Sequence, residues 1–364
     1  MDPLAHTLVG ATLAETRLKN WSAMATPMLI LGANAPDIDA ITMFMDRDLS
    51  LGFRRGLTHG ILAMVVLPVL LTGLLLLTDR MTAKLGNRTP TARAGPLLAL
   101  GTIAVLSHPV LDWLNTYGVR FLMPFDGTWF YGDTLFIVDP WVWLLTLTTV
   151  ALSHSASRLS VAAWVVLGVA LTSLVTGFEG APASARLLWC VGVVGIVWLR
   201  VAGHWQQHLP QLASLCLSAV IVYTTVMLAA SRLAEEQVVT WLADRDDSPV
   251  TIMASPTPAN PFRRDIVVAD AEHYHFLEID WLQTNPIRIT SPSIARGDSG
   301  RITEAALTAP HIWGLATWTR FPVVVVTETD DGYRVAISDA RYTRRVGGGL
   351  GASIVELDRN LNVR

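Results

Sequence analysis

The chain has 364 residues, of which 51% are hydrophobic and only 16% are charged. An ordinary soluble domain carries about 25% charged residues, so the composition argues against a simple cytosolic enzyme. The formal net charge of -3 leaves no basic surface of the kind that nucleic acids require, and no nucleic-acid partner is expected.

Charge is divided unevenly along the chain. Residues 1–234 hold 14 Lys and Arg and 12 Asp and Glu, whereas residues 235–364 hold 13 and 18, so charge density roughly doubles across this point. We therefore predict a membrane-embedded domain over residues 1–234, a linker over residues 235–262 and an extracytoplasmic β-rich domain over residues 263–364.

The N-terminal segment predicts two short helices. Asp2-Pro3 is a good helix start, because an N-cap acceptor precedes a proline at the first helical position, and this helix is expected to run to about Lys19. A second apolar stretch covers Met24–Ala33 and ends at Pro36. Each stretch is too short to cross a bilayer, so the pair is expected to form a hairpin that dips into a helical bundle.

Six further apolar stretches approach the length of about 20 residues that a transmembrane helix needs. They are Gly56–Thr78, Ala94–Leu111, Pro140–Ser157, Leu159–Phe178, Leu187–Leu199 and Val201–Ser231. The shortest can span if its flanking arginines, Arg186 and Arg200, reach toward the membrane surface. The predicted fold is an α-helical integral membrane bundle of about six transmembrane helices plus the N-terminal hairpin, followed by a small, mostly antiparallel β domain.

Basic residues in the short loops predict the orientation. The connection Asp79–Arg93 carries four of them and is expected to face the cytoplasm. Counting six crossings from this loop puts His59, residues 107–139 and everything after Arg232 on the opposite side. A multi-pass protein of the plasma membrane is expected, with its polar site and C-terminal domain outside the cytoplasm.

The amino-acid composition changes in the C-terminal part of the chain. Residues 248–262 contain four prolines, which is typical of a linker. Strands are predicted over Asp265–Ala269, Tyr274–Leu282, and Pro322–Thr329 paired with Tyr333–Ser338. Asp330-Asp331-Gly332 is a recognisable hairpin turn between the last two.

Imidazoles and carboxylates that adjoin apolar helix ends form the candidate site. Acidic groups in a membrane domain are costly, so each carries a functional hypothesis by default. All of them fall on the predicted outer side, as members of one metal site would. The candidate ligands are His6, Asp37, Asp39, His59, His108, Asp112, Asp133 and Asp139.

Two of these motifs are the strongest. His108 and Asp112 are four residues apart, so a helix would place both on one face, close enough to bind one cation. A simple hydrogen bond at a helix end is the alternative. Asp37 and Asp39 lie on a turn and could bind divalent ions through oxygen, although an Asp after proline is also a common N-cap.

Other residues are candidates with a plain alternative. Arg54 and Arg55 precede His59 and could bind phosphate oxygens of a substrate, or could anchor the chain at the membrane surface. Asp133 and Asp139 lie in an aromatic-rich loop that could sit at the level of the lipid headgroups.

At these motifs the chain resembles the YdjM-type family of bacterial membrane-bound metal-dependent hydrolases. The matching segments are Met1-Asp2-Pro3-Leu4-Ala5-His6-Thr7, Pro36-Asp37-Ile38-Asp39, Arg55-Gly56-Leu57-Thr58-His59 and Ser107-His108-Pro109-Val110-Leu111-Asp112. The order of ligands also resembles the zinc-dependent phospholipase C and P1-type nuclease group, but the later His-x-x-x-Glu helix of that group has no clear counterpart here. Asp133 and Asp139 would have to substitute for it.

The resemblance implies an enzyme that holds one to three divalent ions, zinc foremost, and cleaves a phosphoester of a membrane lipid or lipid-linked substrate. Asp39 or Asp133 would then act as general base. A membrane transport or scaffolding protein with a His/Asp path for cations or protons is the main alternative. A membrane-anchored binding module, with the β domain as its functional part, is a third interpretation.

Overall fold

The computed structural model describes residues 1–243, 251–297, 300–344 and 351–364. These residues form two compact units. The helical unit comprises Met1–Ile38, Arg55–Ala230 and Pro256–Pro261, and the second unit comprises Asp39–Arg54, Ser231–Ser255 and Phe262–Arg364. The domain boundaries expected at residues 234 and 262 stay a prediction, and the assignment of residues 39–54 to the second unit was not anticipated from the sequence.

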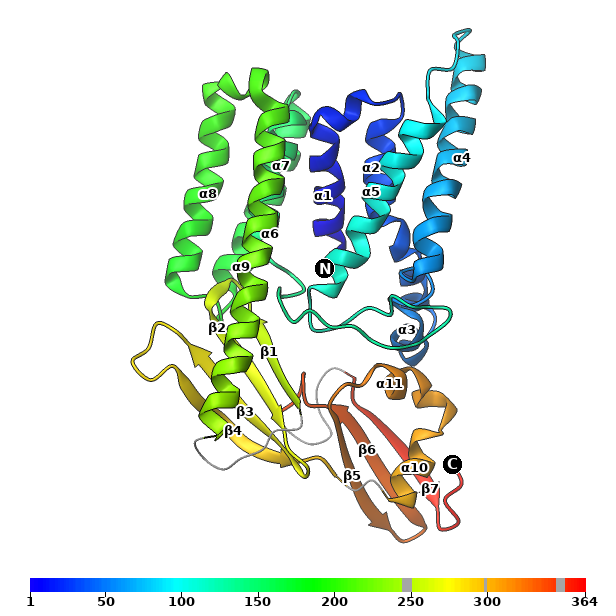
Figure 1. The fold of residues 1–364 in the computed structure, drawn as a ribbon, viewed down its shortest axis with the longest axis vertical. Coiled ribbons are helices and arrows are strands. Elements are labelled where there is room, and N and C mark those ends of the chain that lie inside the picture. The colour runs from blue at the N-terminus through cyan, green and yellow to red at the C-terminus, as the bar shows by residue number, and fades with distance from the viewer. Residues whose placement is uncertain (244–250, 298–299, 345–350) are drawn as a thin grey trace. The chain divides into compact units, whose positions relative to one another are not determined.

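The helical unit contains most of the helices (Figure 1). Its elements are α1 (Pro3–Glu15), η1 (Arg17–Asn20), α2 (Ala25–Asn34), α4 (Ile61–Leu85), α5 (Ala94–Trp113), α6 (Pro140–Ser153), α7 (Arg158–Gly177), α8 (Ala183–Ala202), η3 (His204–His208) and the first part of α9 (Leu209–Ala243). The 3₁₀ segment η2 (Ala35–Phe44) begins in this unit.

Five helices in the described part of the chain are long and apolar enough to cross a membrane. They are α4, α5, α7, α8 and the segment Trp205–Ala243 that contains α9. The expected span beginning at Pro140 is the shorter α6, which has 14 residues. Aliphatic side chains such as Val65 and Leu70 on α4 and Val194 on α8 are exposed, as expected for helices surrounded by lipid hydrocarbon.

Helix α1 begins as predicted and ends earlier than expected. The Asp2 carboxylate accepts a hydrogen bond from the Ala5 N–H (3.1 Å), with Pro3 in the first turn. The helix stops at Glu15 rather than near Lys19 because the Thr16 hydroxyl donates to the Leu13 carbonyl (2.7 Å) and accepts from the Leu18 N–H (3.2 Å), which turns the chain into η1.

Two glycines let α1, α2 and α5 pack closely together near the candidate ligands. A Cβ atom at Gly10 would lie 2.7 Å from the Leu29 carbonyl oxygen, and one at Gly32 would lie 2.7 Å from the Ala104 Cβ. The α1–α2 and α2–α5 contacts therefore depend on glycine at these positions. Figure 1 shows α1, α2, α5 and α4 side by side, and this packing brings the last residues of α2 against the end of α5.

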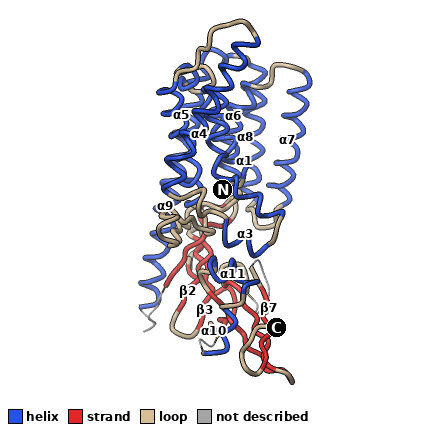
Figure 2. Tube along the Cα trace, turned by 90° about the vertical axis from the view of Figure 1, so that its right-hand side faces the viewer, coloured by secondary structure: helices blue, strands red, loops and turns tan. Residues whose placement is uncertain are grey.

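Two small sheets, drawn as red strands in Figure 2, belong to the second unit except for residues 256–261, which include the end of the first strand and the start of the second. The four-stranded sheet has the order β1 (Thr251–Thr257), β2 (Asn260–Ala269), β3 (His273–Asp280) and β4 (Ile287–Ala295). The three-stranded sheet has the order β5 (Pro322–Thr329), β6 (Gly332–Asp339) and β7 (Ser353–Asp358). The helical elements of the second unit are α3 (Arg47–Phe53), α10 (Arg301–Leu307), η4 (Pro310–Ile312) and α11 (Trp313–Trp318), together with the last part of η2 and the last part of α9.

The expected fold class, a helical membrane bundle followed by a small antiparallel β part, is confirmed. In the β5–β6 hairpin Val326 pairs with Val335 and Thr329 with Gly332, so the turn is at Asp330-Asp331 as the sequence indicated. Strand β1 occupies residues that read as a proline-rich linker, because β1 is an edge strand and tolerates a proline such as Pro256. The expected linker residues 244–250 lie outside the described residues.

Contacts within the second unit tie its non-contiguous segments together. The Asp48 carboxylate of α3 accepts hydrogen bonds from the Gly314 and Leu315 N–H groups at the start of α11 (2.7 and 2.8 Å). Ala234 and Val238 of the last turns of α9 pack with Ile266 of β2 in one apolar cluster. These long-range contacts stabilise a unit whose pieces are far apart in the sequence.

Candidate metal centre

The final turn of α5 supplies two of the site's side chains. His108 and Asp112, four residues apart, point to the same side, as their helical spacing predicts. Their side chains are 0% and 1% exposed. Because α5 is a candidate membrane span that ends at Trp113, both residues lie at the end of a span rather than at its middle.

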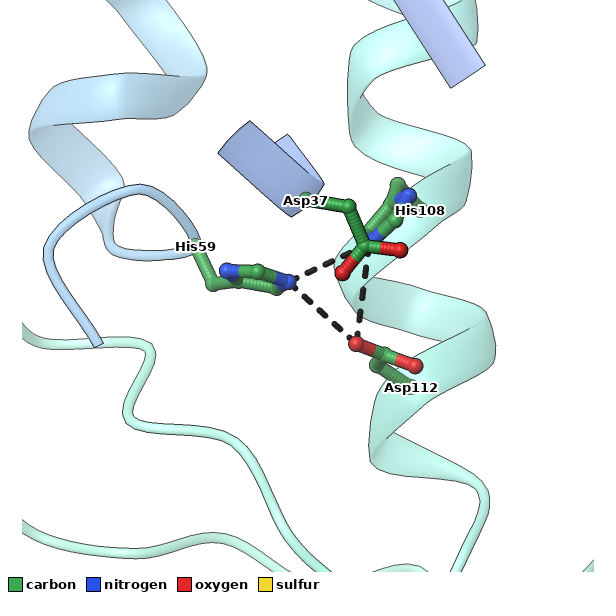
Figure 3. A group of neighbouring side chains, drawn as sticks. All are labelled: Asp37, His59, His108 and Asp112. Atoms are coloured by element: carbon green, nitrogen blue, oxygen red, sulfur yellow. Dashed lines mark hydrogen bonds and ion pairs between the residues drawn. The ribbon is translucent and has the colours of Figure 1, made fainter. Parts of the chain in front are cut away.

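His59 and Asp37 complete a group of four. His59 lies just before α4, and Asp37 lies in η2 directly after α2. One ligand atom from each of the four residues lies within 4.8 Å of all the others. Figure 3 shows the four side chains directed toward one another from three separate segments.

The distances between ligand atoms indicate a common centre. The Nε2 atoms of His59 and His108 are 3.1 Å apart. The Oδ2 atom of Asp112 lies 3.2 Å from His59 Nε2 and 3.6 Å from His108 Nε2. The Oδ1 atom of Asp37 lies 3.6 Å from His108 Nε2. Four donor atoms of nitrogen and oxygen therefore surround one small volume.

The far side of each imidazole is held by a second contact. His108 Nδ1 is 2.7 Å from the Ala33 carbonyl oxygen, which can only accept, so Nδ1 carries the hydrogen. In the neutral ring Nε2 then presents its lone pair to the centre. His59 Nδ1 is 3.0 Å from the Thr58 hydroxyl. Partners of this kind orient the histidine ligands of metal ions.

The two oxygens of Asp112 have different surroundings. Oδ1 receives the Arg55 guanidinium (2.8 Å), lies 3.2 Å from His6 Nε2 and contacts the Met1 backbone nitrogen. For Oδ2 no donor is aligned for a hydrogen bond among the described residues, although the atom is buried. A buried carboxylate oxygen without a donor is costly, and a divalent cation at the centre of the group would remove that cost.

The residues present therefore fit a metal ion. Two imidazole nitrogens and two carboxylate oxygens are a donor set that zinc and other first-row divalent metals accept.

Comparison with known protein families shows to which family the chain is related. The model of the YdjM inner membrane protein family matches residues 1–183. The chain belongs to the YdjM inner membrane protein family. The matched part of this YdjM-family chain contains all four residues of the buried group, and the described portions of the two sheets lie outside it.

One curated relative of the YdjM-family chain is an uncharacterized protein, YfhP, of Bacillus subtilis (strain 168). The two are 26% identical over 163 residues, which is 43% of this chain and 47% of the relative. The chain thus spans about half the length of the curated relative it matches. No solved structure matches the chain at a significant level.

His6 lies against the group of four without belonging to it. Its ring stacks on the His108 ring, with centroids 3.7 Å apart and an angle of 16° between the planes. Its Nε2 is directed at Asp112 Oδ1, the oxygen on the Arg55 side of the carboxylate. The role of His6 as a metal ligand stays a prediction, and its contacts also suit a residue that holds Asp112.

Asp139 and Asp133 are both buried in the YdjM-family chain but are not among the four. Asp139 is the N-cap of α6 and accepts from the Trp141 and Val142 N–H groups and from the Tyr223 hydroxyl (2.9 Å). Burial raises its pKa to about 6, against the effect of these hydrogen bonds. The contacts account for a buried Asp139 without a metal, and ligation by Asp139 or Asp133 stays a prediction.

Asp39 and Arg54 belong to the second unit, and their site roles stay predictions. Arg55 belongs to the helical unit and is only 2% exposed. The sequence patterns did not indicate the Ala33 carbonyl or Asn115, which support His108 and Arg55 respectively. A backbone acceptor leaves no mark in a sequence, whereas an Asn three residues after a candidate Asp is a signal that could have been noticed.

Proposed function

We propose that this protein is a membrane-bound metal-dependent hydrolase that cleaves a phosphoester of a lipid or lipid-linked substrate. The buried group of Asp37, His59, His108 and Asp112 is the observation that carries the proposal. Its donor atoms converge, its imidazoles are oriented from behind, and Asp112 Oδ2 has no other aligned donor in the described part of the chain.

The residues would divide the work as follows. Asp37, His59, His108 and Asp112 hold the ion, with zinc as the first candidate. When bound, a divalent cation lowers the pKa of a coordinated water to about 7 and stabilises negative charge on a phosphoryl oxygen. Asp39 or Asp133 would accept the proton of the attacking water as general base. The proposal includes one to three ions, and the group of four supplies ligands for at least one.

Apolar surface beside His59 supports a lipid substrate. Leu57, Ile61 and Leu62 are exposed to 48%, 55% and 49%, on both sides of His59 in the chain. Apolar side chains at the end of a membrane span suit contact with acyl chains, so a phosphoester at the headgroup level would lie near the buried group. Membrane lipids are thus the expected partners.

Orientation and phosphate binding complete the proposal. We infer that the group lies on the extracytoplasmic side of the inner membrane, because the positive-inside rule predicts a cytoplasmic position for the basic loop before α5. The sequence makes Arg54 and Arg55 candidates for binding the phosphate oxygens of a substrate. Direct contact with substrate stays a proposal for Arg54, while the contacts of Arg55 favour an indirect role.

The test uses the full chain purified in detergent. Elemental analysis should find a bound transition metal, and bis(p-nitrophenyl) phosphate and short-chain phospholipids should be hydrolysed only in the absence of chelator, with activity restored by added zinc. Asp112→Asn keeps the size of the side chain and should lose both metal and turnover. Hydrolysis that persists in the chelated protein would overturn the proposal.

The same experiment addresses the alternative, a transport or scaffolding protein with a cation path. Metal retention without hydrolysis of any phosphoester substrate would favour that function. Against it, the group lies at the ends of α4 and α5, whereas a conduction path needs polar residues near the middle of several spans.

A further inference from the structure

Arg55 is buried in the helical unit and is directed at the back of Asp112. Its Nη2 lies 2.8 Å from Asp112 Oδ1, and its Nη1 donates to the Asn115 side-chain oxygen (2.8 Å). The Tyr117 ring covers the guanidinium, with 4.6 Å between the guanidinium carbon and the ring centroid. The guanidinium thus has a fixed place between the end of α5 and the loop that follows.

The backbone around Arg55 is also constrained. Arg55 has a φ of 54°, a left-handed conformation that residues other than glycine rarely adopt. Its carbonyl oxygen accepts a hydrogen bond from the Arg120 N–H (2.9 Å). Asn115 in turn is fixed by the Tyr117 N–H, which donates to the same side-chain oxygen (2.9 Å). These contacts hold an unfavourable backbone conformation in place at one residue.

Arg55 contacts one oxygen of Asp112 and thereby determines which oxygen is left to face a metal ion. A carboxylate can rotate about its Cβ–Cγ bond, and rotation would exchange the two oxygens or tilt both away from the imidazoles. The guanidinium holds Oδ1, and Oδ2 is thereby turned toward His59 Nε2 and His108 Nε2. Contacts of this kind on the outer side of a ligand typically change metal affinity by about 10- to 100-fold.

We propose that Arg55 is a positioning residue, which clamps Asp112 Oδ1 so that Oδ2 faces the metal ion. This inference rests on the proposed function only in requiring that the group of four binds a metal. It also differs from the expectation drawn from the sequence, in which Arg55 binds substrate directly. The guanidinium acts on the ion through Asp112 and is anchored for this purpose by Asn115 and Tyr117.

The experiment compares metal binding by variants of the full chain in detergent, with zinc and cobalt(II) as probes. Arg55→Ala should weaken zinc binding by about 10- to 100-fold and shift the visible absorption bands of the cobalt(II) protein, because the Asp112 oxygens would lose their fixed orientation. Arg55→Lys should recover part of the affinity, since an ammonium group can still pair with Asp112 but cannot form both contacts of the guanidinium.

Arg88→Ala is the matched control. The Arg88–Asp79 pair has a similar geometry (Nη2 to Oδ1, 2.7 Å) and an equally buried carboxylate, but it adjoins the opposite end of α5, about 30 Å away along the helix. Its loss should leave zinc affinity and the cobalt(II) spectrum unchanged, so a general loss of stability cannot imitate the effect.

Asn115→Ala keeps the test decisive if Arg55→Ala does not fold. It removes only the anchor of the guanidinium and should give a smaller shift of the same kind in the cobalt(II) bands. Unchanged affinity and spectrum in the Arg55 or Asn115 variants, with a wild type that binds metal, would overturn the inference while leaving the metal site intact. A wild type that binds neither probe would overturn the metal site as well.

Discussion

Asp79 and Asp112 are two buried carboxylates at opposite ends of the α4–α5 pair, and each is 1% exposed and paired with an arginine. At Asp79 both oxygens are used: Oδ1 receives Arg88 (2.7 Å), and Oδ2 accepts from the Thr91 and Ala92 N–H groups (2.7 and 2.8 Å). At Asp112 only Oδ1 has aligned donors among the described residues.

The difference shows what distinguishes a structural carboxylate from a candidate ligand. Burial and an arginine partner are common to both, so neither property marks a site. The distinguishing property is an acceptor atom that has no aligned hydrogen-bond donor among the described residues and that lies 3.2 and 3.6 Å from two imidazole nitrogens. The Asp79 carboxylate holds the loop before α5 in place, while Asp112 has one oxygen that could bind an ion.

The largest effect is expected from removing each carboxylate in turn. Asp112→Ala should abolish metal retention without preventing membrane insertion, because the side chain contributes little to the apolar span. Asp79→Ala should retain the metal but lower the melting temperature in detergent, since two backbone N–H groups lose their acceptor.

Elemental analysis of both variants measures their metal content, and a thermal melt measures their stability. The comparison breaks down if Asp79→Ala loses the metal, or if Asp112→Ala retains it at the wild-type level.

An intermediate effect is expected at His6. His6→Asn removes the contact with Asp112 Oδ1 and the stack on His108, but not one of the four donors. Zinc affinity should fall by about tenfold, less than for Asp112→Ala. Isothermal titration of the metal-free variant gives the value. A loss as complete as that of Asp112→Ala would instead make His6 a ligand, as the sequence suggested.

The smallest effect on the metal is expected at Asp139. Asp139→Ala removes an N-cap and should destabilise the protein by about 1 kcal/mol while metal content stays at the wild-type value. Tyr223→Phe, which removes only the hydroxyl that donates to Asp139, serves as its control. Metal analysis that shows a reduced content in Asp139→Ala alone would restore Asp139 to the set of ligands.

Local patterns accounted for the parts of the fold that depend on local interactions. The sequence predicted the helix start at Asp2-Pro3, the apolar spans and the hairpin turn at Asp330-Asp331. Caps, hydropathy and turn residues act within a few positions of the chain, so a sequence reveals them directly. The end of α1 was placed too late because the competing hydrogen bonds of Thr16 are weak signals in a sequence.

The candidate site shows the same division. The i, i+4 spacing predicted that His108 and Asp112 share a face, and the motifs predicted that His59 and Asp37 join them. The spacing could not separate the four grouped residues from Asp139, whose carboxylate also accepts a hydrogen bond from Tyr223, 84 residues away. Residue spacing also could not assign residues 39–54 to the second unit, because the Asp48 contacts with α11 join residues more than 260 positions apart in the chain.

The unequal exposure of the four grouped side chains has a kinetic consequence. His59, His108 and Asp112 have between 0% and 1% exposure, whereas Asp37 keeps 14%. An ion held by this group would enter and leave past the Asp37 side, and its exchange with the medium should be slow compared with that of a surface-bound cation.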